Sequence, residues 1–128
     1  MQIPKNLLYT TEHAWVRKNG DLVVVGITDN LQEMLESIEE VELPRKDDEL
    51  YIGDNCVSIQ HPNGFYDLPS PLTGRVTRIN PALRSSPELV QSSPYKEGWL
   101  FEMEYDDPDE LEMLLDSAAY VEEAEREL

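Results

Sequence analysis

The sequence is short of cysteine, of long apolar runs and of basic residues. Its single cysteine, Cys56, cannot form an internal disulfide, and a zinc site would need several more ligands. The longest apolar run is Leu22–Ile27, whereas a membrane span needs roughly 20 residues. Residues 1–5 contain no apolar core of signal-peptide length. These absences predict a soluble cytoplasmic protein without a metal site.

The shortage of basic residues excludes whole classes of partner. Ten Lys and Arg residues face 27 Asp and Glu residues, which gives a formal net charge of −17. Such a surface repels nucleic-acid phosphates and anionic lipid headgroups. The sequence therefore predicts no nucleic-acid and no membrane partner, and favours a protein that presents a basic patch. A chain of 128 residues, 40% of them hydrophobic, suits one domain spanning residues 1–128.

Short β patterns dominate the chain. They are separated by turn residues, and many short strands at close spacing indicate a sandwich or barrel. Strands are predicted at residues 22–25, 49–52, 56–60, 65–68, 74–79 and 98–105.

Two segments follow a helical period instead. Between residues 28 and 41, Leu31, Met34, Leu35 and Ile38 lie on one helical face. The other segment, about 107–128, begins with the helix-start pattern Asp107-Pro108.

The C-terminal region is strongly acidic. Residues 102–128 hold 12 of the 27 acidic residues and one base, Arg126. One interpretation is a solvated helix face. The other is an electrostatic docking surface that includes Glu122, Glu123 and Glu125, and the sequence alone does not separate the two.

Several motifs resemble the H protein of the glycine cleavage system, in order and over nearly the whole chain. They are Tyr9-Thr10-Thr11-Glu12-His13-Ala14-Trp15-Val16, Gly26-Ile27-Thr28-Asp29, Val41-Glu42-Leu43-Pro44, Gly53-Asp54, Ser70-Pro71-Leu72-Thr73-Gly74, Ser86-Pro87-Glu88-Leu89-Val90 and Pro94-Tyr95-Lys96-Glu97-Gly98-Trp99.

The resemblance implies a fold and a role. The fold is mainly β with α: a lipoyl/biotinyl-like β-sandwich (barrel-sandwich hybrid), with a helix after the first strands and C-terminal helices. In that family a lysine at the tip of a β-hairpin carries lipoate. The lipoyl arm passes an aminomethyl group from the P protein to the T protein and is reoxidised by the L protein, so the H protein is a carrier and not an enzyme.

This chain departs from the family at the lipoyl position. The family pattern Glu-Ser-Val-Lys-Ala-Ala-Ser-Asp-Leu aligns with residues 60–68, and the lysine position is Asn63. An asparagine carboxamide is not nucleophilic and cannot form the lipoyl amide. We therefore expect no lipoate cofactor and a non-lipoylated homologue that acts as a scaffold, decoy or regulator. Its expected partners are P-protein-like or other lipoate-dependent or lipoate-attaching enzymes.

The replaced hairpin tip still carries a turn signal, Pro62-Asn63-Gly64. Phe65 and Tyr66 stand where the family has small residues. They either pack locally or form a contact patch, since aromatic residues are enriched at binding hot spots.

Two other functions stay open. The chain could be a working lipoyl carrier that is modified at an unexpected site. It could also be a small enzyme built on Cys56 and His61, although residues five apart on a regular strand point to opposite faces. No other catalytic residues are predicted.

Overall fold

The structure is a computed structural model that describes residues 2–126. Met1, Glu127 and Leu128, which belong to the predicted domain and, in part, to the predicted C-terminal helical segment, lie outside the described residues. Within that range the strands are β1 (Leu8–Tyr9), β2 (Ala14–Asn19), β3 (Leu22–Ile27), β4 (Glu40–Glu42), β5 (Glu49–Leu50), β6 (Asn55–His61), β7 (Gly64–Pro69), β8 (Gly74–Ile79) and β9 (Phe101–Tyr105). The helices are α1 (Asp29–Leu35), the 3-10 helix η1 (Pro81–Arg84), α2 (Leu89–Ser92), α3 (Pro108–Leu111) and α4 (Ser117–Arg126).

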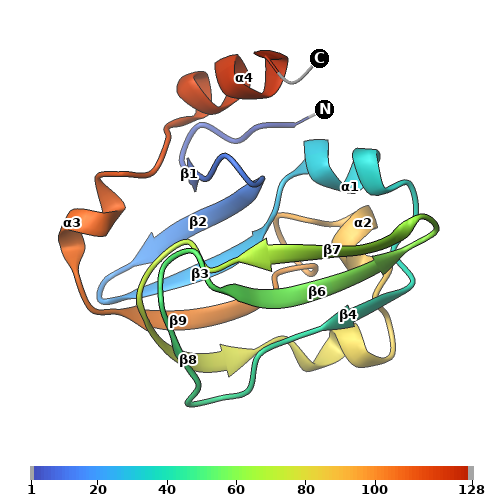
Figure 1. Ribbon diagram of the computed structural model, residues 1–128, viewed down its shortest axis with the longest axis horizontal. Helices are drawn as coiled ribbons and strands as arrows, with labels where there is room; N and C mark the ends of the chain where they lie inside the picture. Colours follow the sequence, from blue (N-terminus) through green and yellow to red (C-terminus); the bar gives the residue numbers. More distant parts are fainter. Residues whose placement is uncertain (1, 127–128) are drawn as a thin grey trace.

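Two antiparallel sheets form the body of the molecule (Figure 1). The six-stranded sheet has the order β1-β2-β3-β9-β8-β5, and the three-stranded sheet has the order β4-β6-β7. The two sheets do not close into a barrel. The predicted mainly β sandwich, with a helix after the first strands, is confirmed.

The core lies between the two sheets and follows the period-2 alternation of the strands. The three-stranded sheet contributes apolar side chains that are at most 8% exposed, namely Val41, Val57, Ile59 and Leu68. The six-stranded sheet contributes residues of the same kind, including Val16, Val23, Val25, Val76, Phe101 and Met103.

The first helix is shorter than predicted. Thr28 is its N-cap, and the Thr28 hydroxyl accepts a hydrogen bond from the Leu31 amide at 3.2 Å. Glu36 has a φ of +72°, which turns the chain out of the helix after Leu35. Ile38 is therefore buried outside the helix, and Met34 is 55% exposed rather than on an apolar face.

The predicted helical segment 107–128 is interrupted. Asp107 caps α3 as expected, with its carboxylate accepting from the Asp109 amide at 2.9 Å. Before α4 begins, however, Leu115 pairs as a β-bridge with Tyr9, through two backbone hydrogen bonds of 2.8 Å. This tertiary pairing overrides the local helical pattern.

Helix α4 is held to the first strands by Tyr120, which is 1% exposed. The Tyr120 ring stacks on Tyr9 with a centroid distance of 4.8 Å. The Tyr120 hydroxyl lies 2.6 Å from His13 Nδ1 and 2.8 Å from Thr28 Oγ1. The last helix thus covers the first strand at one end of the molecule (Figure 1).

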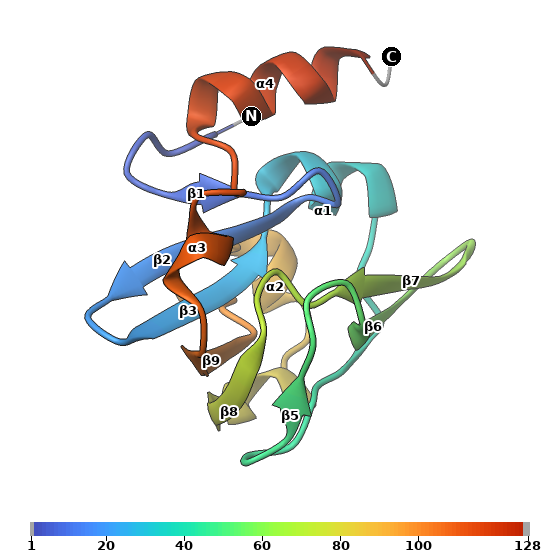
Figure 2. The same ribbon diagram turned by 60° about the vertical axis from the view of Figure 1, so that its left-hand side comes forward.

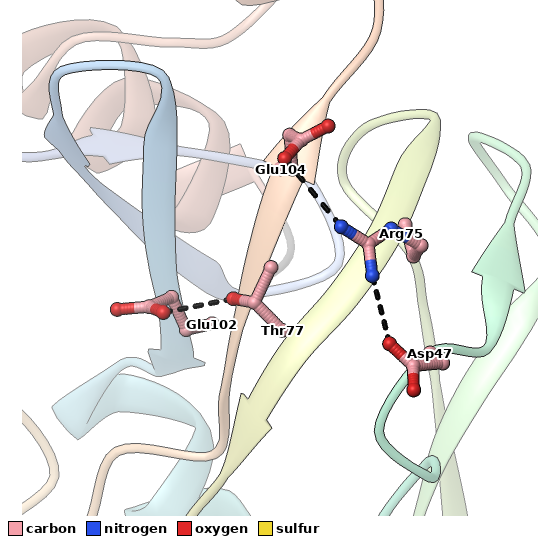
Figure 3. A network of polar contacts seen from close by, with 5 residues as sticks. All are labelled: Asp47, Arg75, Thr77, Glu102 and Glu104. Atoms are coloured by element: carbon pink, nitrogen blue, oxygen red, sulfur yellow. Dashed lines mark hydrogen bonds and ion pairs between the residues drawn. The ribbon is translucent and has the colours of Figure 1, made fainter.

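Charged pairs join β8 to its neighbours (Figure 3). Arg75 lies 2.7 Å from Asp47 and 3.7 Å from Glu104 on β9. Glu102, which is 7% exposed, accepts hydrogen bonds from Arg78 at 2.9 Å and from Thr77 at 2.8 Å. The bond from Arg78, with that from Thr77, holds the pKa of Glu102 below its usual value.

Gly74 marks the point where the chain leaves the three-stranded sheet for β8. A Cβ at this position would lie 1.9 Å from the Glu104 carbonyl oxygen. We expect Gly74→Ala to lower the free energy of unfolding by about 3 kcal/mol, measured by urea denaturation. Gly20→Ala is the control, because its Cβ meets no atom within 4 Å and only the φ of +66° opposes it, at about 1 kcal/mol. Equal losses in the two variants would contradict the backbone clash.

Candidate functional site

Strands β6 and β7 form a hairpin whose tip projects away from the rest of the chain (Figure 2). The register pairs His61 with Gly64 and leaves Pro62 and Asn63 as the turn, both exposed. Gly64, the first residue of β7, has a φ of +133°. At the tip the positive φ is therefore at Gly64 and not at Asn63.

The tip cannot hold lipoate by the family's linkage. The side chain at the lysine position is the exposed carboxamide of Asn63, which offers no amine for an amide bond. The four lysines lie outside the hairpin, at positions 5, 18, 46 and 96. The residues present therefore do not fit the prosthetic group.

The two aromatic residues beside the tip lie on opposite faces of β7. Tyr66 is paired with Ile59, packs against the core, and donates a hydrogen bond from its hydroxyl to the Glu12 carbonyl at 2.7 Å. Phe65 is paired with Gln60 and is 69% exposed. Tyr66 thus packs locally, and of the pair only Phe65 is presented on the outside of the hairpin.

Phe65 belongs to a polar sheet face that the sequence patterns did not predict. The solvent side of the three-stranded sheet, which we call the outer sheet face, consists of Glu40, Glu42, Ser58, Gln60, Phe65 and Asp67. All except Asp67 line a hollow of about 250 Å³. The alternation Glu40-Val41-Glu42 was the available signal, since an acid on each side of a buried valine places both carboxylates outward.

The structure does not assemble a reactive pair from Cys56 and His61. Cys56 lies at a β-bulge between Asn55 and Val57, and its thiol donates to the Leu68 carbonyl at 3.5 Å. No hydrogen bond joins the two side chains within residues 2–126, and His61 Nδ1 is buried without a hydrogen-bond partner. Burial raises the pKa of the Cys56 thiol to about 12, the opposite of what a nucleophile needs.

The C-terminal acids are partly neutralised within their own helix. Arg126 lies 3.0 Å from Glu122 and 2.8 Å from Glu123, while Glu125 is exposed. Such i,i+3 and i,i+4 pairs are typical of a solvated helix surface. A docking role for these three acids stays a prediction.

No group of three or more His, Cys, Asp or Glu side chains in residues 2–126 is arranged to hold a metal ion. In the same range, no helix has the length and apolarity needed to cross a membrane.

The raised pKa of Cys56 gives a direct test of the enzyme hypothesis. Because the thiolate is the reactive form, iodoacetamide at pH 8 should alkylate the folded protein about 1000-fold more slowly than the urea-unfolded chain. The measurement is the rate of adduct formation by intact mass. The low reactivity should persist in a His61→Gln variant. If the folded protein is alkylated fast, and His61→Gln slows that alkylation, this geometry is contradicted.

Comparisons with known proteins agree on one family. The family model described as "Glycine cleavage H-protein" matches residues 7–127. The glycine cleavage system H protein of Anaeromyxobacter sp. strain K is 41% identical over 120 residues, covering 94% of both chains. That of Bacteroides thetaiotaomicron is 43% identical, covering 94% of this chain and 95% of the relative.

The fold agrees as well. The crystal structure of a glycine cleavage system H protein from Mycobacterium marinum matches with a TM-score of 0.85 and 26% identity, covering 96% of this chain and 99% of the other. With its hairpin, its two open sheets and these matches along nearly its full length, the chain belongs to the glycine cleavage system H-protein family.

Proposed function

We propose that this chain is a non-lipoylated member of its family that works by binding other proteins, as a scaffold or regulator, and not by carrying an aminomethyl group. The observation that carries the proposal is Asn63 at the exposed tip of an otherwise well-formed hairpin. The attachment chemistry is absent where the family has it, while the surface that surrounds it is folded and exposed.

The structure around the tip supports binding over loss of function. Strand register, a two-residue turn and a glycine at positive φ keep the hairpin intact. The family's carrier chemistry depends on one lysine, whereas docking depends on a surface, so the loss of the first leaves the second in place. The second candidate, a carrier modified elsewhere, has less support because the four lysines lie outside the hairpin.

The partner class follows from the family and from charge. We propose P-protein-like or other lipoate-dependent enzymes, or lipoate-attaching enzymes, with a basic docking surface. A net charge of −17 attracts such a surface over a long range and speeds encounter. The expected cytoplasmic location stays a prediction.

The absence of a lysine at the tip gives a prediction about modification. Incubated with a lipoate ligase, lipoate and ATP, the protein should gain no lipoyl mass, because Asn63 offers no amine. Intact mass spectrometry gives the readout, and a lipoylated H protein of the family serves as the positive control. A lipoyl increment on any of the four lysines would establish the carrier alternative.

A gain-of-function variant tests whether the missing lysine is the reason that the protein is not lipoylated. Pro62→Val with Asn63→Lys restores two of the family's residues at the tip, the valine and the lysine, and we expect a detectable fraction of lipoylated product under the same conditions. The matched control, Pro62→Val alone, should stay unmodified. Modification of the control would mean that the lysine at position 63 is not the determining feature.

The net negative charge gives a prediction about electrostatic steering of the encounter with a partner. Binding to the P protein encoded in the same genome should be measurable at low salt, and the association rate should fall about tenfold as salt screens the field. Replacing Glu122 and Glu125 by lysine should slow association and leave dissociation unchanged, as is usual for rim charges. Surface plasmon resonance separates the two rates. Replacement of both residues by aspartate, which keeps the charges, is the control. If neither the P protein nor a lipoate-attaching enzyme binds at low salt, the docking role is refuted.

A further inference from the structure

The outer sheet face has the layout of a cation-binding site, which we call the socket. Its residues form two rows across the three strands: Glu40, Gln60 and Phe65 in one, and Glu42, Ser58 and Asp67 in the other. Neighbouring strands lie ~4.8 Å apart, so Glu40 and Phe65 flank Gln60 at roughly 10 Å from each other. That spacing leaves room for one planar group above Gln60, between the Glu40 carboxylate and the Phe65 ring.

The charges on this face have one sign. Glu40, Glu42 and Asp67 carry its three carboxylates, and within residues 2–126 none of them is ion-paired to a base. Arg45 lies nearby, but it lines a second hollow of about 330 Å³ that adjoins the first at Glu42 and Ser58. The Phe65 end of the face is therefore the end that favours a cation.

Phe65 is the feature that a solvated acidic surface would not need. Its ring is 69% exposed, on a strand position opposite the polar Gln60. The negative face of an aromatic ring attracts a cation within about 6 Å, and two nearby carboxylates strengthen that attraction. None of the helices described in residues 2–126 covers this side of the sheet in Figure 1, where the three strands lie nearest the viewer.

We propose that the outer sheet face binds an arginine side chain of a basic partner protein, with the guanidinium stacked on Phe65 and hydrogen-bonded to Glu40 and Glu42. Arginine fits better than lysine because its planar group stacks on a ring and donates to two carboxylates at once. The inference rests on the proposed binding function in that the arginine belongs to a protein partner. It names the surface that makes the contact.

A peptide titration tests the socket without the natural partner. The probe is a glycine-spaced peptide with three arginines, added to the isotope-labelled protein at low salt and followed by NMR. We expect the amide signals of residues 40, 42, 60, 65 and 67 to shift together. The same peptide with citrulline, which keeps the shape without the charge, should produce no such shifts. Shifts confined to other parts of the molecule would overturn the proposal.

Substitutions of Phe65 separate stacking from plain apolar contact. Phe65→Leu should weaken peptide binding about fivefold, and Phe65→Trp should retain or strengthen it. Because the side chain is exposed, both variants should keep the thermal unfolding temperature of the parent protein. Equal affinity of Phe65→Leu and the parent protein would rule out the stacked guanidinium.

Charge substitutions separate a local site from the general field. Glu40→Gln with Glu42→Gln should weaken binding more than Asp21→Asn with Glu112→Gln, which removes the same charge from exposed positions elsewhere. Equal weakening by the two pairs would show a field effect without a socket.

Binding of the P protein to the parent protein and to Phe65→Leu separates failure of the proposed function from failure of the socket. If the peptide binds this face but neither the P protein nor the ligase binds the chain, the proposed function fails and the socket stands. If the P protein binds with the same affinity for parent and Phe65→Leu, the function stands and the socket fails.

Discussion

The burial of Val57, Ile59 and Leu68 against the six-stranded sheet is the interaction on which the rest of the structure depends. Side chains alternate along a strand, so once these three point inward, the register of the hairpin is set. A slip by one residue would bury Gln60 and Ser58 and expose the core. The same constraint that stabilises the sandwich therefore decides that Phe65 faces solvent and that Tyr66 faces the body of the protein.

This constraint also explains how one position can lose its chemistry without loss of the fold. Asn63 contributes nothing to the inner surface of the sheet, because it lies in the turn beyond the last paired residues, His61 and Gly64. The turn depends on its backbone conformation, with a φ of +133° at Gly64, and not on the side chain of Asn63. Carrier chemistry and architecture are thus separable at this tip, as is general for functional groups placed on a stable scaffold.

Local patterns predicted the elements that depend on local physics. The turn at Pro62-Asn63-Gly64, the cap at Asp107 and the strand 74–79 all lie where the sequence placed them. The patterns failed where distant residues decide. The pairing of Leu115 with Tyr9 splits the predicted C-terminal helical segment. The outer sheet face was missed for a related reason, since its rows join three strands whose register no single segment shows.

The contact between Tyr120 and the first strands has a consequence for synthesis of the chain. His13 and Tyr120 are 107 positions apart, so the second apolar cluster, which joins Tyr9, Trp15 and Tyr120, cannot form until almost the whole chain has left the ribosome. Contacts of such long sequence separation form late and slow the folding of small domains. The β6–β7 hairpin, with its local contacts, can pair well before this closure. A nascent chain stalled before residue 120 would therefore lack the cluster that holds α4 to the first strands.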